Sequence, residues 1–121
     1  MTIEMAELQQ QLDQKSLDVE LVSFSVDPEL DTPDVLKKYI KQFTDDESNW
    51  HLLTGYSQED IESFAREDFQ SIVLKHDASS QVLHGTNFYL IDQEGYVINE
   101  YNFIEEAYME DLLKDIEKLK R

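Results

Sequence analysis

The stretch 19-VELVSFSVDPELDTPDVLKKYIKQF-43 decides how this chain folds, because its composition changes from strand-like to helical within a few residues. Residues 19–26 are rich in β-branched side chains and almost continuously apolar, which predicts an internal strand that is largely covered. Asp27-Pro28 predicts a turn, since proline disfavours the helical conformation in the residue before it. Thr32 then predicts an N-cap, with Pro33 at the first helical position. The stretch is therefore expected to form a strand, a turn and a helix.

Further helices are predicted on both sides of this stretch. Apolar residues at helical spacing predict an amphipathic helix over residues 2–15, which already begins at Met1. Ser57, with Asp60 three residues later, predicts the capped start of another helix. The last helix is expected over residues 105–119. The predicted inward-facing residues are Ile3, Met5, Leu8 and Leu12 in the first helix; Val35, Leu36, Tyr39, Ile40 and Phe43 in the second; Ile61, Phe64 and Ala65 in the third; and Tyr108, Leu112, Ile116 and Leu119 in the last.

Short β-rich segments separate these helices. The runs NWHLLTG (49–55) and QSIVLKH (70–76) are brief and apolar, and each is predicted as a short strand. In NFYLIDQEGYVINEY (87–101), two β-rich runs flank a turn in which Gly95 can take the left-handed conformation, which predicts a hairpin.

The alternation of helices and strands predicts an α/β protein with a mixed sheet and flanking helices. The length of 121 residues suits a single domain. A chain that enters such a sheet through a helix usually has a strand before it. Since Met1 already lies in the first predicted helix, we expect the strand before that helix to be missing.

The charge of −17, from 27 acidic and 10 basic residues, disfavours binding to nucleic acid and to anionic membrane surfaces. It suits either plain solubility or a basic protein partner. The chain contains no cysteine, which excludes disulfides, thiolate metal sites and thiol nucleophiles within it. With no membrane-spanning run and no signal peptide, the chain is expected to be soluble and to carry no targeting signal or anchor.

Motifs of independent catalysis are absent. The sequence has no phosphate-binding glycine loop, no G-x-S-x-G and no H-E-x-x-H. The acidic clusters at 44–49 and 92–95 do not follow the calcium-loop pattern and are expected to be solvated loops. We therefore expect that the chain is not an enzyme.

Four segments, taken in order, resemble the Sco/SenC family. They are MT-x-x-M-x-x-LQ at Met1, LVSFSVDPELDTPDVLKKYIKQF from Leu21, W-x-LLTG from Trp50 and H-x-x-x-FYLID-x-x-G-x-V from His84. The resemblance implies a thioredoxin-like fold and a role in assembling the copper centre of cytochrome c oxidase. It also implies an oxidase subunit as partner and an extracytoplasmic, membrane-anchored location.

The same resemblance implies a copper site. Family members bind copper through a C-x-x-x-C-P motif and a later histidine, and the two cysteines can also cycle between dithiol and disulfide. His84 matches the histidine, so it takes the family's copper-ligand position, and Asp27 matches an acidic residue in the loop near the site. Residues 1–121 would then form one Sco-type domain that is truncated before the cysteine motif.

From the residues themselves, a single imidazole cannot hold copper selectively, because affinity requires several converging ligands. We therefore expect this chain to bind no copper. Asp27 is either a turn residue or a second-shell residue that orients a ligand. His51 and His76 are expected at the surface, and Trp50 and Tyr56 in or beside the core.

Two classes of function remain open. One is Sco-like copper delivery or thiol-redox chemistry whose cysteine half is absent from this chain. The alternative is a redox-inactive, thioredoxin-like acidic module that binds other proteins. A third reading is a fragment with no function of its own. Without the missing strand, its two neighbours would close up, leave ladder groups exposed or take a strand from another chain. We therefore expect marginal stability or self-association through strand edges.

Overall fold

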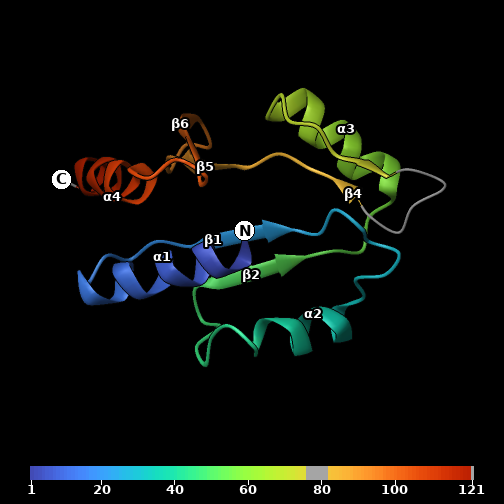
Figure 1. The fold of residues 1–121 in the computed structure, drawn as a ribbon, viewed down its shortest axis with the longest axis horizontal. Coiled ribbons are helices and arrows are strands. Elements are labelled where there is room, and N and C mark those ends of the chain that lie inside the picture. The colour runs from blue at the N-terminus through green and yellow to red at the C-terminus, as the bar shows by residue number, and fades with distance from the viewer. Residues whose placement is uncertain (76–81, 121) are drawn as a thin grey trace. The chain divides into compact units, whose positions relative to one another are not determined.

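The computed structural model describes residues 1–75 and 82–120. Helices and strands alternate along this part of the chain (Figure 1), which confirms the predicted α/β class. The helices are α1 (Thr2–Gln14), α2 (Pro33–Ile40), α3 (Gln58–Asp68) and α4 (Tyr108–Leu119). The strands are β1 (Leu21–Phe24), β2 (Trp50–Leu53), β3 (Leu74–Lys75), β4 (Val82–Leu83), β5 (Asn87–Ile91) and β6 (Val97–Asn102).

The chain divides into two compact units. Unit 1 comprises Met1–Val19 and Thr86–Arg121, and therefore holds α1, α4 and the strands β5 and β6. Unit 2 comprises Glu20–Gly85 and holds the other helices and strands. The expectation of one domain over residues 1–121 stays a prediction.

In unit 2, β1 and β2 lie side by side and run parallel, with Leu21 opposite Trp50 and Phe24 opposite Leu53. A parallel pair needs a crossover connection, and α2 supplies it, lying beside β2 (Figure 1). A second, antiparallel pair joins β3 to β4 through two residue pairs, Leu74 with Leu83 and Lys75 with Val82. The strand β4 was not among the predicted elements.

The predicted helix starts in unit 2 are confirmed. The Thr32 hydroxyl accepts a hydrogen bond from the Val35 backbone N–H at 3.4 Å, with Pro33 as the first residue of α2. The Ser57 hydroxyl accepts one from the Asp60 N–H at 3.0 Å. Each side chain satisfies a donor that the first helical turn leaves free.

The prediction that the first strand is covered on both faces is wrong. Leu21 is buried, but Val22 and Phe24 are 44% and 40% exposed. Val22 and Phe24 are two residues apart and lie on the same face of the strand, and that face is only partly covered in the described part of the chain. In α2, likewise, Ile40 is buried, whereas Val35 and Tyr39 of the predicted inner face are exposed.

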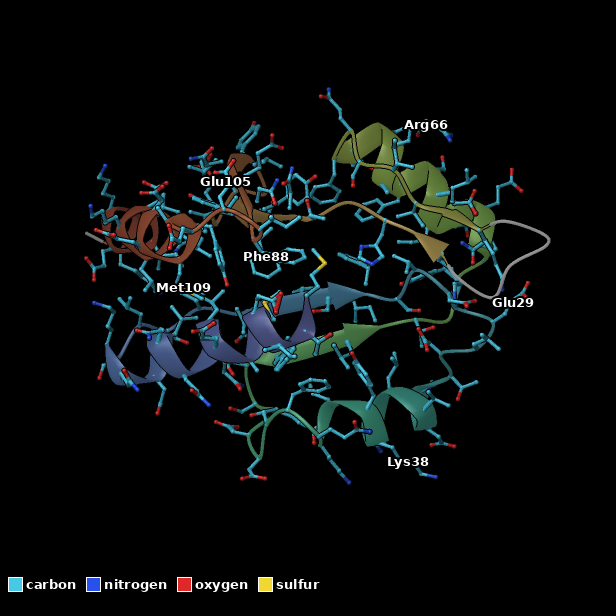
Figure 2. All side chains as sticks on the ribbon, viewed as in Figure 1. Glu29, Lys38, Arg66, Phe88, Glu105 and Met109 are labelled. Atoms are coloured by element: carbon cyan, nitrogen blue, oxygen red, sulfur yellow. The ribbon has the colours of Figure 1, made fainter. Side chains whose placement is uncertain are left out.

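Unit 1 is built around the predicted hairpin. β5 and β6 pair antiparallel, and Gly95 has the left-handed φ of +92° that the turn requires. The Asp92 carboxylate accepts the backbone N–H groups of Glu94 and Tyr96, each at 2.9 Å, and this fixes the turn. Phe88 projects from β5 (Figure 2), and its ring contacts those of Phe103 and Tyr108.

The two helices of unit 1 depart in detail from their predicted stripes. In α4, Leu112, Leu113 and Ile116 are buried, but Leu119 is 42% exposed. This helix begins at Tyr108 rather than Glu105, because the segment after β6 first forms turns, including one in which the Glu105 N–H donates to the Asn102 carbonyl. In α1, Leu8 and Leu12 are buried, as expected, and Ile3 is exposed.

The strands form three separate two-stranded ladders in the described part of the chain. β1 therefore has a partner on one edge, and its other edge offers ladder groups to a further strand. The expected self-association through strand edges stays a prediction, and this edge makes it testable.

We expect association to strengthen as ionic strength rises, because salt screens the repulsion between chains of charge −17. Val22→Lys should weaken it, since a lysine on an exposed edge strand opposes strand pairing. Val35→Lys is the matched control, because Val35 is also about half exposed but lies on α2. Sedimentation velocity over a concentration series measures the effect. A monomer at every salt concentration, or equal effects of the two variants, would contradict the prediction.

Candidate functional site

His84 follows directly after β4, and its side chain is exposed. Its Nδ1 lies 2.8 Å from the carbonyl oxygen of Gly85. A carbonyl can only accept, so Nδ1 carries the proton in this contact and the neutral ring keeps its lone pair on Nε2. His84 therefore presents an exposed Nε2 that can act as a metal ligand.

Gly85 keeps the His84 segment close to the chain that leaves α3. A Cβ added at residue 85 would lie 2.6 Å from the Ser71 hydroxyl oxygen. A side chain at this position would force Ser71 to move, so glycine permits the close approach.

Asp27 lies in the turn between β1 and α2, where its side chain is 13% exposed. Its carbonyl oxygen accepts the backbone N–H groups of Leu30 and Asp31, which confirms the predicted turn. Its own N–H donates to the Ser25 hydroxyl oxygen, and that hydroxyl donates to the Asp31 carboxylate at 2.6 Å. The loop 25–31 is thus fixed by its own side chains, and Asp31 takes part in it.

Tyr56, which lies just before α3, and Gln58, the first residue of α3, form hydrogen bonds with the same loop. The Tyr56 hydroxyl lies 2.6 Å from the Ser25 carbonyl oxygen and 2.9 Å from that of Leu53. The Gln58 side-chain amide donates to the Val26 carbonyl at 3.0 Å. Burial is the main cause that raises the pKa of Tyr56 to about 12, so the hydroxyl remains a donor throughout the physiological range.

Lys75 supplies the counter-charge to Asp27. Its Nζ donates to Asp27 Oδ1 at 3.0 Å and lies 3.8 Å from Glu29 Oε2. Glu29 lies on the same loop (Figure 2). The hydrogen bond to Asp27 is the main cause that raises the pKa of Lys75, so the ammonium form is favoured. Lys75 and Asp27, far apart in the sequence, are thus joined, and Asp27 had been predicted to belong to the site.

The lysine itself escaped sequence reasoning. It stands in the apolar run QSIVLKH, in a chain with only 10 basic residues. A lone lysine in an otherwise apolar strand signals a buried carboxylate partner, because a charge seldom enters such a strand unpaired. That signal could have been used, although it does not say which of the 27 acidic residues is the partner.

The residues present do not by themselves fit a copper site. In the part of the chain that the structure describes, no group of three His, Asp or Glu side chains is placed to hold a metal ion. The sequence contains no cysteine, and Cu(I) favours soft thiolate ligands. The Asp27 oxygen nearest to Lys75 already accepts an ammonium group. The assignments of His84 as a copper ligand and of Asp27 as a second-shell residue stay predictions.

The remaining candidate residues are structural. His51 is exposed, with Nε2 2.7 Å from the Glu20 carboxylate. His76 lies outside the described residues. Trp50 is buried, as expected, and its indole N–H donates to the Ser23 hydroxyl at 3.2 Å.

Within residues 1–75 and 82–120, no helix has the length and apolar character needed to cross a membrane.

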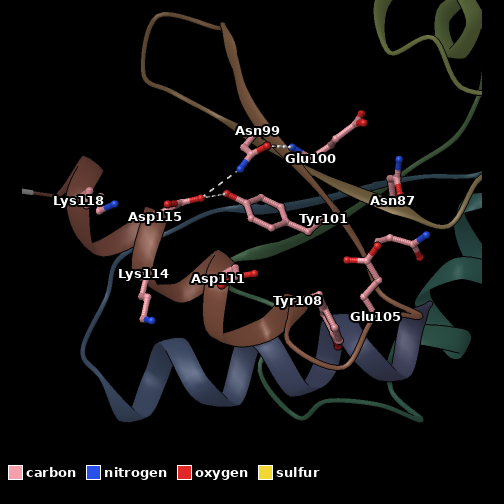
Figure 3. A pocket seen from close by; sticks show the side chains of 11 residues that line it. Asn87, Asn99, Glu100, Tyr101, Glu105, Tyr108, Asp111, Lys114, Asp115 and Lys118 are labelled. Carbon is pink, nitrogen blue, oxygen red and sulfur yellow. Dashed lines mark hydrogen bonds between the residues drawn. The ribbon is translucent and has the colours of Figure 1, made fainter.

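Unit 1 carries a separate polar groove of about 540 Å³ (Figure 3). Residues of β5, β6, α4 and the turns between them line it. On one side the Asp115 carboxylate accepts hydrogen bonds from the Tyr101 hydroxyl at 2.5 Å and from the Asn99 amide at 3.3 Å. These bonds tie α4 to β6, so this side of the groove has a structural role.

The hydrogen bonds at Asp115 change the pKa values of both Asp115 and Tyr101. The hydrogen bond from Tyr101, followed by that from Asn99, lowers the pKa of Asp115. Burial and the neighbouring carboxylate raise the pKa of Tyr101. A carboxyl whose pKa is lowered on folding stabilises the folded state above its unfolded pKa, and this contribution is lost as the pH falls through the folded value.

We expect Tyr101→Phe to raise the pKa of Asp115 and to lower the free energy of unfolding at neutral pH by about 1 kcal/mol. The difference in stability between the variant and the parent chain should shrink as the pH falls through the pKa of Asp115. NMR titration of the carboxyl carbon and urea unfolding at several pH values measure both effects. Tyr96→Phe, a change at an exposed tyrosine in the turn between β5 and β6, serves as control. An unchanged pKa of Asp115 in Tyr101→Phe would refute the assignment.

Comparison with known proteins gives a consistent result. The family model SCO1/SenC matches residues 1–121. The SCO1 protein homolog of Bacillus subtilis is 42% identical over 116 residues, which cover 96% of this chain and 60% of that protein. The chain thus spans well under two thirds of this curated relative.

Solved structures agree with this match. A SCO1/SenC family lipoprotein from Bacillus anthracis superposes with a TM-score of 0.94 at 51% identity, covering 99% of this chain and 71% of that one. BsSco, which has a disulfide switch and belongs to the Sco family of cytochrome c oxidase assembly proteins, gives 0.85 at 40% identity, covering 96% and 67%. Copper-bound ScoI from Arabidopsis thaliana gives 0.73 at 27% identity, covering 97% and 73%.

These structures show that the fold is thioredoxin-like, as the resemblance implied. The match over residues 1–121 covers both units and includes the loop of Asp27 and the segment of His84. The chain belongs to the SCO1/SenC family.

Proposed function

We propose that this chain carries the histidine half of a Sco-type site that delivers copper, or serves thiol-redox chemistry, during assembly of the copper centre of cytochrome c oxidase. The observation that carries the proposal is the family match over residues 1–121. The exposed His84 Nε2 supports it, since a ligand that hands its metal to a partner must be reachable from outside.

Copper is the cargo in this proposal, and His84 alone cannot hold it. Two thiolates would have to complete the site, and this sequence supplies none. We place them in protein sequence beyond the 121 residues. The thiol–disulfide exchange that such a pair could perform would belong to that longer protein, and we propose no enzymatic activity for this chain.

An oxidase subunit is the proposed partner, and the proposed location is extracytoplasmic and membrane-anchored. The Bacillus anthracis relative is a lipoprotein, which supports this location. The charge of −17 would steer the chain towards a basic face on that partner. The alternative function, an acidic interaction module without copper or redox chemistry, is favoured by one observation, the lack of cysteine.

We expect titration of the 121-residue chain with Cu(I) and Cu(II) to show no stoichiometric binding, because one imidazole is the only family ligand present. His84→Ala should therefore leave the titration unchanged. His51→Ala is the matched control, since His51 is also an exposed histidine of unit 2. Competition titration against a chelator of known affinity is the measurement. Tight one-to-one binding that His84→Ala removes would show that this chain holds a complete site.

Two further observations separate the functions. An in-frame strand and C-x-x-x-C-P motif upstream of the Met1 codon would support the copper or redox role, and a stop codon there would oppose it. In cells, His84→Ala should lower the copper content of the oxidase, whereas His51→Ala should not. If neither variant changes it, the interaction module is the better description.

A further inference from the structure

We propose that Lys75 is a positioning residue that ties the His84 segment to the loop of Asp27. The inference rests on the proposed function only in giving His84 a ligand's role. The contact itself lies within unit 2 and joins two segments that the family resemblance places near the same site.

A hydrogen bond and a strand pairing connect the Asp27 carboxylate to His84. Lys75 Nζ donates to Asp27 Oδ1 at 3.0 Å, which fixes the end of the lysine side chain. Its backbone lies in β3, opposite Val82 of β4. The strand β4 ends at Leu83, so His84 is the next residue along the chain. The position of Lys75 therefore limits where His84 can lie.

The ion pair is less exposed than an ordinary surface pair. The side chains of Lys75 and Asp27 are 26% and 13% exposed, whereas those of Lys114 and Glu110, an exposed pair on α4, are 64% and 71% exposed. Exposed pairs contribute little, because water and salt screen them. Removing Lys75 would leave a largely buried carboxylate without its counter-charge, which is costly.

The ion pair joins the Asp27 loop to the β3–β4 ribbon, and the loop has more stabilising contacts of its own than the ribbon has. The loop of Asp27 has other anchors in the bonds of Ser25, Tyr56 and Gln58. Among the described residues the β3–β4 ribbon has two residue pairs, and a two-stranded ribbon is marginally stable by itself. Loss of the ion pair should therefore loosen the ribbon and leave the loop in place.

This arrangement also assigns a role to Asp27. An ammonium group at 3.0 Å satisfies the charge of the carboxylate and opposes the approach of a metal cation to the same oxygen. Asp27 is then the fixed anchor for Lys75, and its influence on His84 passes through the ribbon.

The test is amide hydrogen exchange of the full chain without copper. Lys75→Met keeps the apolar stem and removes the charge, and Lys75→Arg keeps the charge. In Lys75→Met we expect exchange at residues 82–84 to accelerate by about tenfold while exchange at residues 27–31 stays unchanged. The NMR signals of the His84 ring should shift in the same variant, and Lys75→Arg should restore both. Lys38→Met, on the surface of α2 (Figure 2), should change neither.

Unchanged exchange at residues 82–84 in Lys75→Met would overturn the proposal. A uniform acceleration across residues 20–75 would also overturn it, since that pattern means loss of global stability. Asp27→Asn leaves Lys75 only its longer contact with Glu29 and should reproduce most of the effect of Lys75→Met. The double variant should add nothing to Lys75→Met, because that change already removes the contact with Asp27. A failure of His84→Ala to affect the oxidase would count against the proposed function alone, since the exchange experiment contains no copper.

Discussion

The largely buried carboxylate of Asp27 is the constraint on which the site-bearing unit depends. A charge in such a place must be paired, and Lys75 pairs it from a strand that lies far along the sequence. The same loop accepts bonds at its backbone carbonyls from Tyr56 and Gln58, so elements from three parts of unit 2 converge on it. A short turn after β1 thereby becomes the point at which β3, the start of α3 and the start of α2 are held together.

Local signals in the sequence predicted local structure well. Thr32, Ser57 and Gly95 act through hydrogen bonds or a backbone angle within a few residues, and the structure confirms all three. The extent of strand burial was predicted wrongly. Whether Val22 is covered depends on what packs against its face of β1, and an apolar run looks the same whether one face or both are covered.

The site was less predictable than the fold, because it too depends on contacts between segments that are far apart in the sequence. The positions of Asp27 and His84 came from a family resemblance, because a single histidine and an Asp-Pro turn carry no chemistry of their own. The partner of Asp27 could not be inferred, since any of ten basic residues could have filled that role. β4 escaped notice because two residues are too few to show an alternating pattern.

In the proposed role of copper delivery, His84 would have to bind the metal and then release it, and its placement is suited to both. Its exposed Nε2 can be reached by a partner, while Nδ1 is held by the neighbouring carbonyl. A ligand on a long, fully paired strand would be rigid and hard to withdraw. A ligand that follows a short ribbon, held at Lys75 by its ion pairs with Asp27 and Glu29, can move when those pairs are broken. Since the Asp27 loop has several other anchors, such movement would leave the rest of unit 2 unchanged.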